Sequence, residues 1–119
     1  MTALMREHPV AAAERRRTAG TPATHAIFEG RAHAIGEEPI VVGAGSGEGR
    51  RIALAGAGSG ISRTHCSLMR ERGRAIVRDH SRYGTFLNGE RVAGEAELGA
   101  GDRLRVGTPG VVLELVAVG

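Results

Sequence analysis

Residues 61–68 read I-S-R-T-H-C-S-L, and residues 77–89 read V-R-D-H-S-R-Y-G-T-F-L-N-G. Each segment joins a short strand signal to a loop of small and hydroxylated residues, the first around Arg63 and the second around Arg82. Arginine and hydroxyl groups are the donors that hold a phosphate, because charge-assisted hydrogen bonds suit its oxygens. The two loops are therefore the first candidates for a binding site.

Short apolar runs separated by turn residues continue on both sides of this stretch. Asn88-Gly89 is the strongest two-residue hairpin signal in the chain. Residues 103–106 alternate strictly, which predicts that Leu104 and Val106 point inward. About ten short strands with tight turns predict an all-β sandwich of two antiparallel sheets. The expected strands cover residues 25–29, 31–35, 39–42, 50–54, 65–70, 74–78, 85–87, 91–92, 103–106 and 111–118.

The length of 119 residues suits a single domain. Hydrophobic residues make up 41% of the chain but aromatic residues only 3%, so aliphatic side chains must fill the core. Residues 1–24 contain few large apolar groups, which predicts a flexible N-terminal segment before a domain at residues 25–119. A docking role for the arginine run at residues 15–17 is the alternative for this segment.

Charge and cysteine content exclude several kinds of partner. The chain has 16 basic residues, all of them arginine, and 13 acidic residues, so the net charge is only +3. Nucleic-acid binding is not expected, because aromatic residues for base stacking are nearly absent. Cys66 is the single cysteine, which fits a reducing compartment, and no apolar run approaches the ~18 residues of a membrane span. These features predict a cytoplasmic protein without a membrane partner.

Two glycine-rich copies of G-A-G-S-G, at residues 43–47 and 56–60, lack the spacing of a nucleotide-binding loop. Side chains of the types found in hydrolase active sites and metal sites occur at Ser62, His65, Cys66, Asp79 and His80. Neither an oxyanion-hole signature nor paired metal-ligand spacing accompanies them. We therefore expect no catalysis, no metal and no cofactor.

Several ordered motifs resemble the forkhead-associated (FHA) family. Residues 62–65 match its S-x-x-H element, and residues 81–85 match S-x-N-G-T at all fixed positions but one. The N-G pair at residues 88–89 and the L-x-x-G-D-x-L run at residues 98–104 follow in the family's order. The resemblance covers roughly residues 25–118. It implies a sandwich of two antiparallel sheets with recognition loops at one end.

The FHA family recognises phosphothreonine peptides, so the resemblance implies a protein interaction module used in signalling. It also implies roles for the loop residues. Those implied to contact phosphopeptide are Ser62, Arg63, Arg82, Tyr83 and Gly84. Those implied to brace the loops are His65, Thr85 and Asn88.

Two positions depart from the family pattern. Ala44 stands where the family's G-R element has the arginine that grips phosphate, and Tyr83 stands where it has asparagine. Arg50 or Arg51, beyond a flexible loop, is the candidate substitute for the missing arginine. The sequence therefore predicts weak recognition of phosphothreonine-containing partners. The alternative is a degenerate FHA domain that binds a protein partner without phosphate.

Overall fold

The computed structural model describes residues 20–54 and 60–118, which form eleven strands and no helix. The strands are β1 (His25–Phe28), β2 (Arg31–Ala34), β3 (Ile40–Gly43), β4 (Arg51–Ala53), β5 (Cys66–Glu71), β6 (Arg74–Asp79), β7 (Thr85–Leu87), β8 (Glu90–Arg91), β9 (Glu95–Leu98), β10 (Arg103–Val106) and β11 (Val111–Val116).

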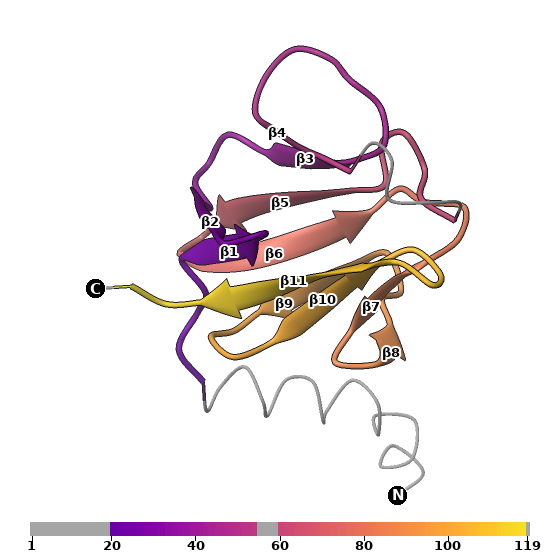
Figure 1. Ribbon diagram of the computed structural model, residues 1–119. Helices are drawn as coiled ribbons and strands as arrows, with labels where there is room; N and C mark the ends of the chain where they lie inside the picture. The colour runs from indigo at the N-terminus through magenta and orange to yellow at the C-terminus, as the bar shows by residue number, and fades with distance from the viewer. Residues whose placement is uncertain (1–19, 55–59, 119) are drawn as a thin grey trace, which may run out of the picture.

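The strands form two sheets that stack face to face (Figure 1). One sheet has the order β2-β1-β11-β10-β7-β8 and the other β4-β3-β5-β6-β9. All neighbouring strands are antiparallel except β3 and β4, which run parallel. The predicted all-β sandwich is confirmed. Strand β9 was not among the expected strands, because Glu95 to Leu98 contains a single large apolar residue and lies at a sheet edge.

The core lies between the two sheets and is built by alternation along the strands. Leu104 and Val106 are fully buried, as the strict alternation of β10 predicted. The core is almost entirely aliphatic, so it gains its free energy from many mid-sized side chains and not from a few aromatic rings. The largest fully buried aliphatic side chains are Ile40, Val42, Ile52, Leu54, Leu68, Val77, Leu98, Leu104, Val106, Leu113 and Leu115.

The Asn88-Gly89 turn joins β7 to β8, as the sequence predicted. Asn88 has a φ of 51° and Gly89 of 89°, the left-handed pair that tight hairpins require. The Asn88 side chain donates from Nδ2 to Asp102 Oδ1 at 2.9 Å and accepts at Oδ1 from the Arg103 amide at 2.9 Å. The turn is therefore tied to the start of β10.

The first described residues pack against the domain. Ala23 is fully buried, and its amide donates to Leu98 O at 3.0 Å. The Thr24 amide donates to Val116 O at 2.8 Å. The small side chain of Ala23 belongs to the core. The rest of the predicted N-terminal segment, residues 1–19, lies outside the described residues, as does most of the second G-A-G-S-G copy.

In residues 20–54 and 60–118, no helix has the length and apolar character needed to cross a membrane.

Candidate functional site

Three loops meet at one end of the sandwich, formed by residues 43–45, 62–64 and 81–84; we call this the three-loop end. The Ala44 amide donates to Ser62 O at 3.0 Å, and the Gly45 amide donates to Arg63 O at 3.1 Å. The two backbones approach so closely that a Cβ atom at Gly43 would lie 2.1 Å from the Arg63 carbonyl oxygen. Only glycine fits this position.

His65 is fully buried and joins the second loop to the third. Its Nδ1 accepts a hydrogen bond from the Ser62 amide at 3.0 Å. This assigns the ring proton to Nε2, which donates to Gly84 O at 2.8 Å. Both ring nitrogens are therefore engaged by backbone groups of different loops.

Gly84 is the point at which the third loop meets the rest of the end. Its carbonyl oxygen accepts from His65 Nε2 and also from the Gly107 amide at 3.1 Å. Its φ is 100°, and a Cβ atom there would lie 3.0 Å from two ring carbons of Phe86. A side chain at position 84 would therefore be strained and would press on the neighbouring ring.

Asp79 organises the third loop from within. Its Oδ1 accepts from the Ser81 hydroxyl at 2.6 Å, from the Ser81 amide at 3.1 Å and from the Thr85 hydroxyl at 2.7 Å. Ser81 Oγ in turn accepts from the Gly84 amide at 2.8 Å. Partial burial acts to raise the pKa of Asp79, but the hydrogen bonds from Ser81 and Thr85 outweigh it and the pKa is lowered.

The lowered pKa of Asp79 predicts a pH dependence of stability. A carboxyl group with a lower pKa in the folded state than in the unfolded state stabilises the fold above the unfolded pKa of about 4. We expect that contribution to disappear as the pH falls through the folded pKa. Urea unfolding between pH 2 and 7 should show a shallower acid dependence for Asp79→Asn than for the parent. Equal slopes would contradict the role of the carboxylate.

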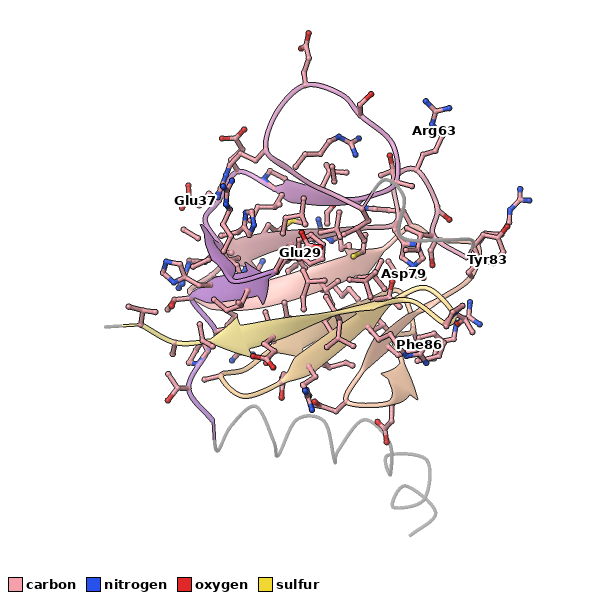
Figure 2. All side chains as sticks on the ribbon, viewed as in Figure 1. Glu29, Glu37, Arg63, Asp79, Tyr83 and Phe86 are labelled. Carbon is pink, nitrogen blue, oxygen red and sulfur yellow. The ribbon has the colours of Figure 1, made fainter. Side chains whose placement is uncertain are left out.

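The outer surface of the three-loop end presents hydrogen-bond donors. Ser62 Oγ accepts from the Arg82 amide at 3.2 Å, which leaves its own hydrogen available to a ligand. Arg63 and Arg82 are exposed, and neither forms an ion pair with a described residue. Tyr83 is 48% exposed. Figure 2 shows Arg63 and Tyr83 projecting outward from the same end of the molecule.

Position 44 lies beside these donors, since the Ala44 amide is bonded to the Ser62 carbonyl oxygen. A surface hollow is lined by Ala44, Gly45 and Arg63, together with Ser46 and Ala53. Figure 1 shows the loop between β3 and β4, residues 44–50, as a wide arc above this region.

Arg51 is bound within its own loop, and Arg50 acts electrostatically on His33. Arg51 donates from its terminal nitrogen to Gly45 O at 3.1 Å, inside the 44–50 loop. Arg50 lies near His33: burial first, and then the charges of Arg31 and Arg50, lower the pKa of that histidine. Among the described residues, neither arginine forms a hydrogen bond or ion pair with the second loop.

The structure brings together seven of the eight residues singled out from the sequence. Ser62, Arg63, His65, Arg82, Tyr83, Gly84 and Thr85 lie on the second and third loops or at their strand junctions. Asn88 does not join them, because its bonds to Asp102 and Arg103 lie at the other end of β7. Sequence reasoning named Asp79 only as a possible catalytic part. The D-x-S spacing at residues 79–81, typical of a turn in which a side chain caps the backbone, was the available signal.

Neither His65 nor Cys66, two residues of types used in hydrolysis, is in a state suited to catalysis. Both ring nitrogens of His65 bind backbone groups, as described above. Burial foremost, and then the charge of Asp79, raise the pKa of Cys66 to about 12, so its thiol stays protonated. Among the described residues, no three side chains of the metal-ligating types come together.

Comparison with known proteins agrees with this architecture. The family model of the FHA domain matches residues 40–107. Similar solved structures include an FHA domain of an Arabidopsis thaliana hypothetical protein, with 27% identity, a TM-score of 0.63, and coverage of 85% of this chain and 93% of that one. The FhaA FHA domain, solved with the intracellular domain of Rv3910, has 26% identity and a TM-score of 0.59, covering 73% and 89%.

A third similar structure, the MEK1 FHA domain solved with a phosphothreonine peptide of HOP1, has 22% identity and a TM-score of 0.66 and covers 83% of this chain and 99% of that one. At this identity the likeness concerns the fold alone. The search of curated proteins found no match. The family model nevertheless spans more than half of the chain. The chain therefore belongs to the FHA-domain family.

Proposed function

We propose that this FHA domain binds phosphothreonine-containing protein partners at its three-loop end, and that it does so weakly. One observation carries the proposal: Ser62, Arg63 and Arg82 lie on two loops joined by a hydrogen bond, and both arginine side chains are exposed. The hydrogen bond between Ser62 Oγ and the Arg82 amide joins their loops. The buried ring of His65 also joins them, because it binds the Ser62 amide and the Gly84 carbonyl oxygen. A hydroxyl and two guanidinium groups on a rigid frame suit a phosphate dianion.

The similar structures support a binding module and not an enzyme. The FhaA domain was solved with a protein partner, and the MEK1 domain with a phosphothreonine peptide. In this chain the groups that would serve as nucleophile or base are committed to structural bonds or kept protonated. The free, buried thiol of Cys66 also supports the proposal of a reducing, cytoplasmic location.

The weak affinity follows from position 44. The Ala44 amide is hydrogen-bonded to the Ser62 carbonyl oxygen, so an arginine side chain at position 44 would reach a phosphate bound at Ser62. Arg51 is bound to Gly45 O inside its own loop. A charge-assisted hydrogen bond contributes about 1.5–3 kcal/mol, so its absence weakens binding roughly tenfold to a hundredfold.

The same observation favours a second candidate, a degenerate domain that binds its partner without phosphate. In that case the exposed ring of Tyr83 and the hollow beside Ala44 would form the contact surface. The two candidates differ in a single measurable property, namely whether binding depends on phosphorylation of the threonine.

Titration of a phosphothreonine peptide and its unphosphorylated twin tests the proposal. We expect the parent to prefer the phosphorylated peptide, and Arg63→Gln to lose most of that preference. Arg72→Gln is the matched control, because Arg72 is an exposed arginine in the β5–β6 turn at the other end of these strands. Equal binding of the two peptides by the parent would favour the phosphate-independent candidate.

A further inference from the structure

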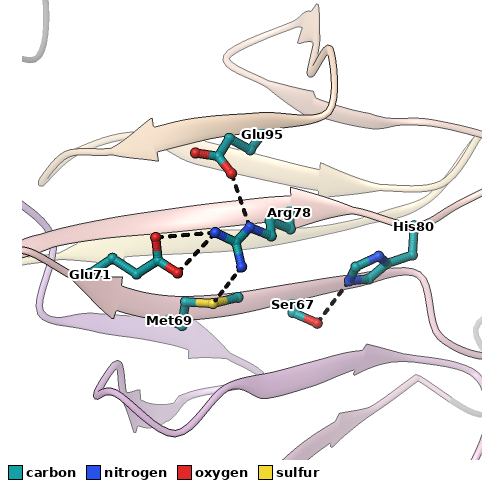
Figure 3. Close-up of polar contacts among 6 residues, drawn as sticks. All are labelled: Ser67, Met69, Glu71, Arg78, His80 and Glu95. Atoms are coloured by element: carbon teal, nitrogen blue, oxygen red, sulfur yellow. Dashed lines mark hydrogen bonds and ion pairs between the residues drawn. The ribbon is translucent and has the colours of Figure 1, made fainter.

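Three arginines elsewhere on the domain pair with glutamates on neighbouring strands. Figure 3 shows Arg78 on the outer face of the five-stranded sheet, bonded to Glu71 and Glu95 at 2.9 Å each. Arg74 and Arg103 pair in the same way with glutamates of β9 and β11. Three strand arginines therefore have acidic partners on neighbouring strands.

Two arginines next to the three-loop end lack such partners. Arg91 places Nε 3.2 Å from the position that a Cβ atom of Gly84 would take. Arg105 lies over the Phe86 ring, with its guanidinium carbon 4.1 Å from the ring centroid, and donates to the Gly107 carbonyl oxygen. Neither forms an ion pair with a carboxylate of the described residues.

The strand register places these two arginines on one surface. Phe86 of β7 is paired with Arg105 of β10 on one side and with Arg91 of β8 on the other. Directly paired residues of antiparallel strands point to the same face of a sheet. Arg105, Phe86 and Arg91 therefore form a row across three strands, which we call the β7 row.

The β7 row is continuous with the three-loop end. Arg91 Nε lies beside Gly84, 3.2 Å from the position that a Cβ atom there would take, and Gly84 is only two residues beyond Arg82. Arg105 reaches the same junction through Gly107, whose amide donates to Gly84 O. A bound segment that extends from Ser62 and Arg82 toward β8 would meet two further positive charges.

We propose that the β7 row binds acidic side chains that flank the phosphothreonine in the partner protein. This inference rests on the proposed function, since it extends the same site. Charge complementarity decides the occupant, because the guanidinium groups of Arg91 and Arg105 have no carboxylate partner among the described residues and can bind carboxylates of a partner. A nucleic acid is the other polyanion, but Arg105 covers one face of the Phe86 ring, and that face is closed to a stacking base.

Four peptides test the inference: phosphorylated or unphosphorylated threonine, flanked on both sides by either three glutamates or three glutamines. We expect the glutamate phosphopeptide to bind the parent about two- to fivefold more tightly per arginine engaged than the glutamine phosphopeptide, as for exposed ion pairs. Arg91→Gln and Arg105→Gln should each reduce this advantage, and Arg91→Lys should keep most of it.

Arg103→Gln is the matched control, because Arg103 lies on β10 but pairs with Glu114 at 3.5 Å. It makes the same change in net charge and should leave the glutamate advantage intact. An advantage that survives in both Arg91→Gln and Arg105→Gln would overturn the inference, and so would an equal loss in Arg103→Gln. Melting temperatures of all variants show that each is folded.

The design separates this inference from the proposed function. If phosphate has no effect in either peptide background, the proposed function fails. The comparison of glutamate with glutamine peptides then still shows whether the β7 row binds acidic side chains, because any preference for glutamate should fall in Arg91→Gln. An oligothymidylate that binds through Arg91, with no preference between glutamate and glutamine peptides, would overturn the inference in favour of a nucleic acid.

Discussion

Replacing His65 with alanine is expected to lower the free energy of unfolding by about 2–4 kcal/mol. The ring is fully buried, and its loss removes the acceptor of the Ser62 amide and the donor to Gly84 O. A buried group left without a partner costs about 1–3 kcal/mol, and the empty volume adds to this. Urea unfolding measures the change. Because the same bonds hold the second and third loops together, peptide binding should fall as well.

His80→Ala is the matched control for this measurement. His80 is an exposed histidine of the same region, and its side chain bonds only to Ser67 Oγ, at 3.1 Å, among the described contacts. We expect its replacement to cost less than about 1 kcal/mol, as for an exposed hydrogen bond. If the two variants unfold at the same urea concentration, His65 does not hold the loops.

Gly43→Ala is expected to have the second large effect, on stability and binding together. The added Cβ atom would lie 2.1 Å from the Arg63 carbonyl oxygen and 2.8 Å from that of Ser62. Both atoms belong to backbone, so the second loop must move away from the first. Overpacking of this kind costs about 1–3 kcal/mol and sometimes more. The displaced loop carries Arg63, and so we expect phosphopeptide affinity to fall with stability.

Gly36→Ala provides the comparison. Gly36 has nothing within 4 Å of its would-be Cβ atom and is not among the glycines with a positive φ. This change should be neutral or stabilise by up to about 1 kcal/mol, because alanine restricts the unfolded chain. Thermal melts of both proteins give the answer. Similar melting temperatures would show that the first loop can yield at Gly43 without cost.

Most of the fold could be predicted from the sequence because strand alternation and turn chemistry are local signals. Asn88-Gly89 fixed a hairpin, and Leu104 and Val106 identified the inner face of β10. The strand at Glu95 to Leu98 was not predicted because it has little apolar character of its own and forms by backbone pairing with β6. Ala23 escaped for a similar reason, since only the tertiary structure shows that a small residue fills the core there.

The site was predictable in its residue types and less so in its contacts. The motif spacing brought Ser62 and Arg82 into consideration together, and their loops do meet. The destination of Arg51 could not be read from the sequence, because it depends on the path of the 44–50 loop. The bonds that gather Ser81 and Thr85 onto Asp79 were likewise hidden, since the carboxylate could equally have faced solvent.

Titration calorimetry on Ala44→Arg tests whether the three-loop end is a phosphothreonine site that Ala44 weakens. The parent and Ala53→Arg serve as references. Ala53 also lines the hollow, so Ala53→Arg adds the same charge there. Unlike Ala44, however, Ala53 is not hydrogen-bonded to Ser62. We expect Ala44→Arg to bind a phosphothreonine peptide roughly tenfold to a hundredfold more tightly than the parent, and Ala53→Arg to gain much less. Equal affinities for the parent and Ala44→Arg, with no preference for the phosphorylated peptide in either, would contradict this expectation.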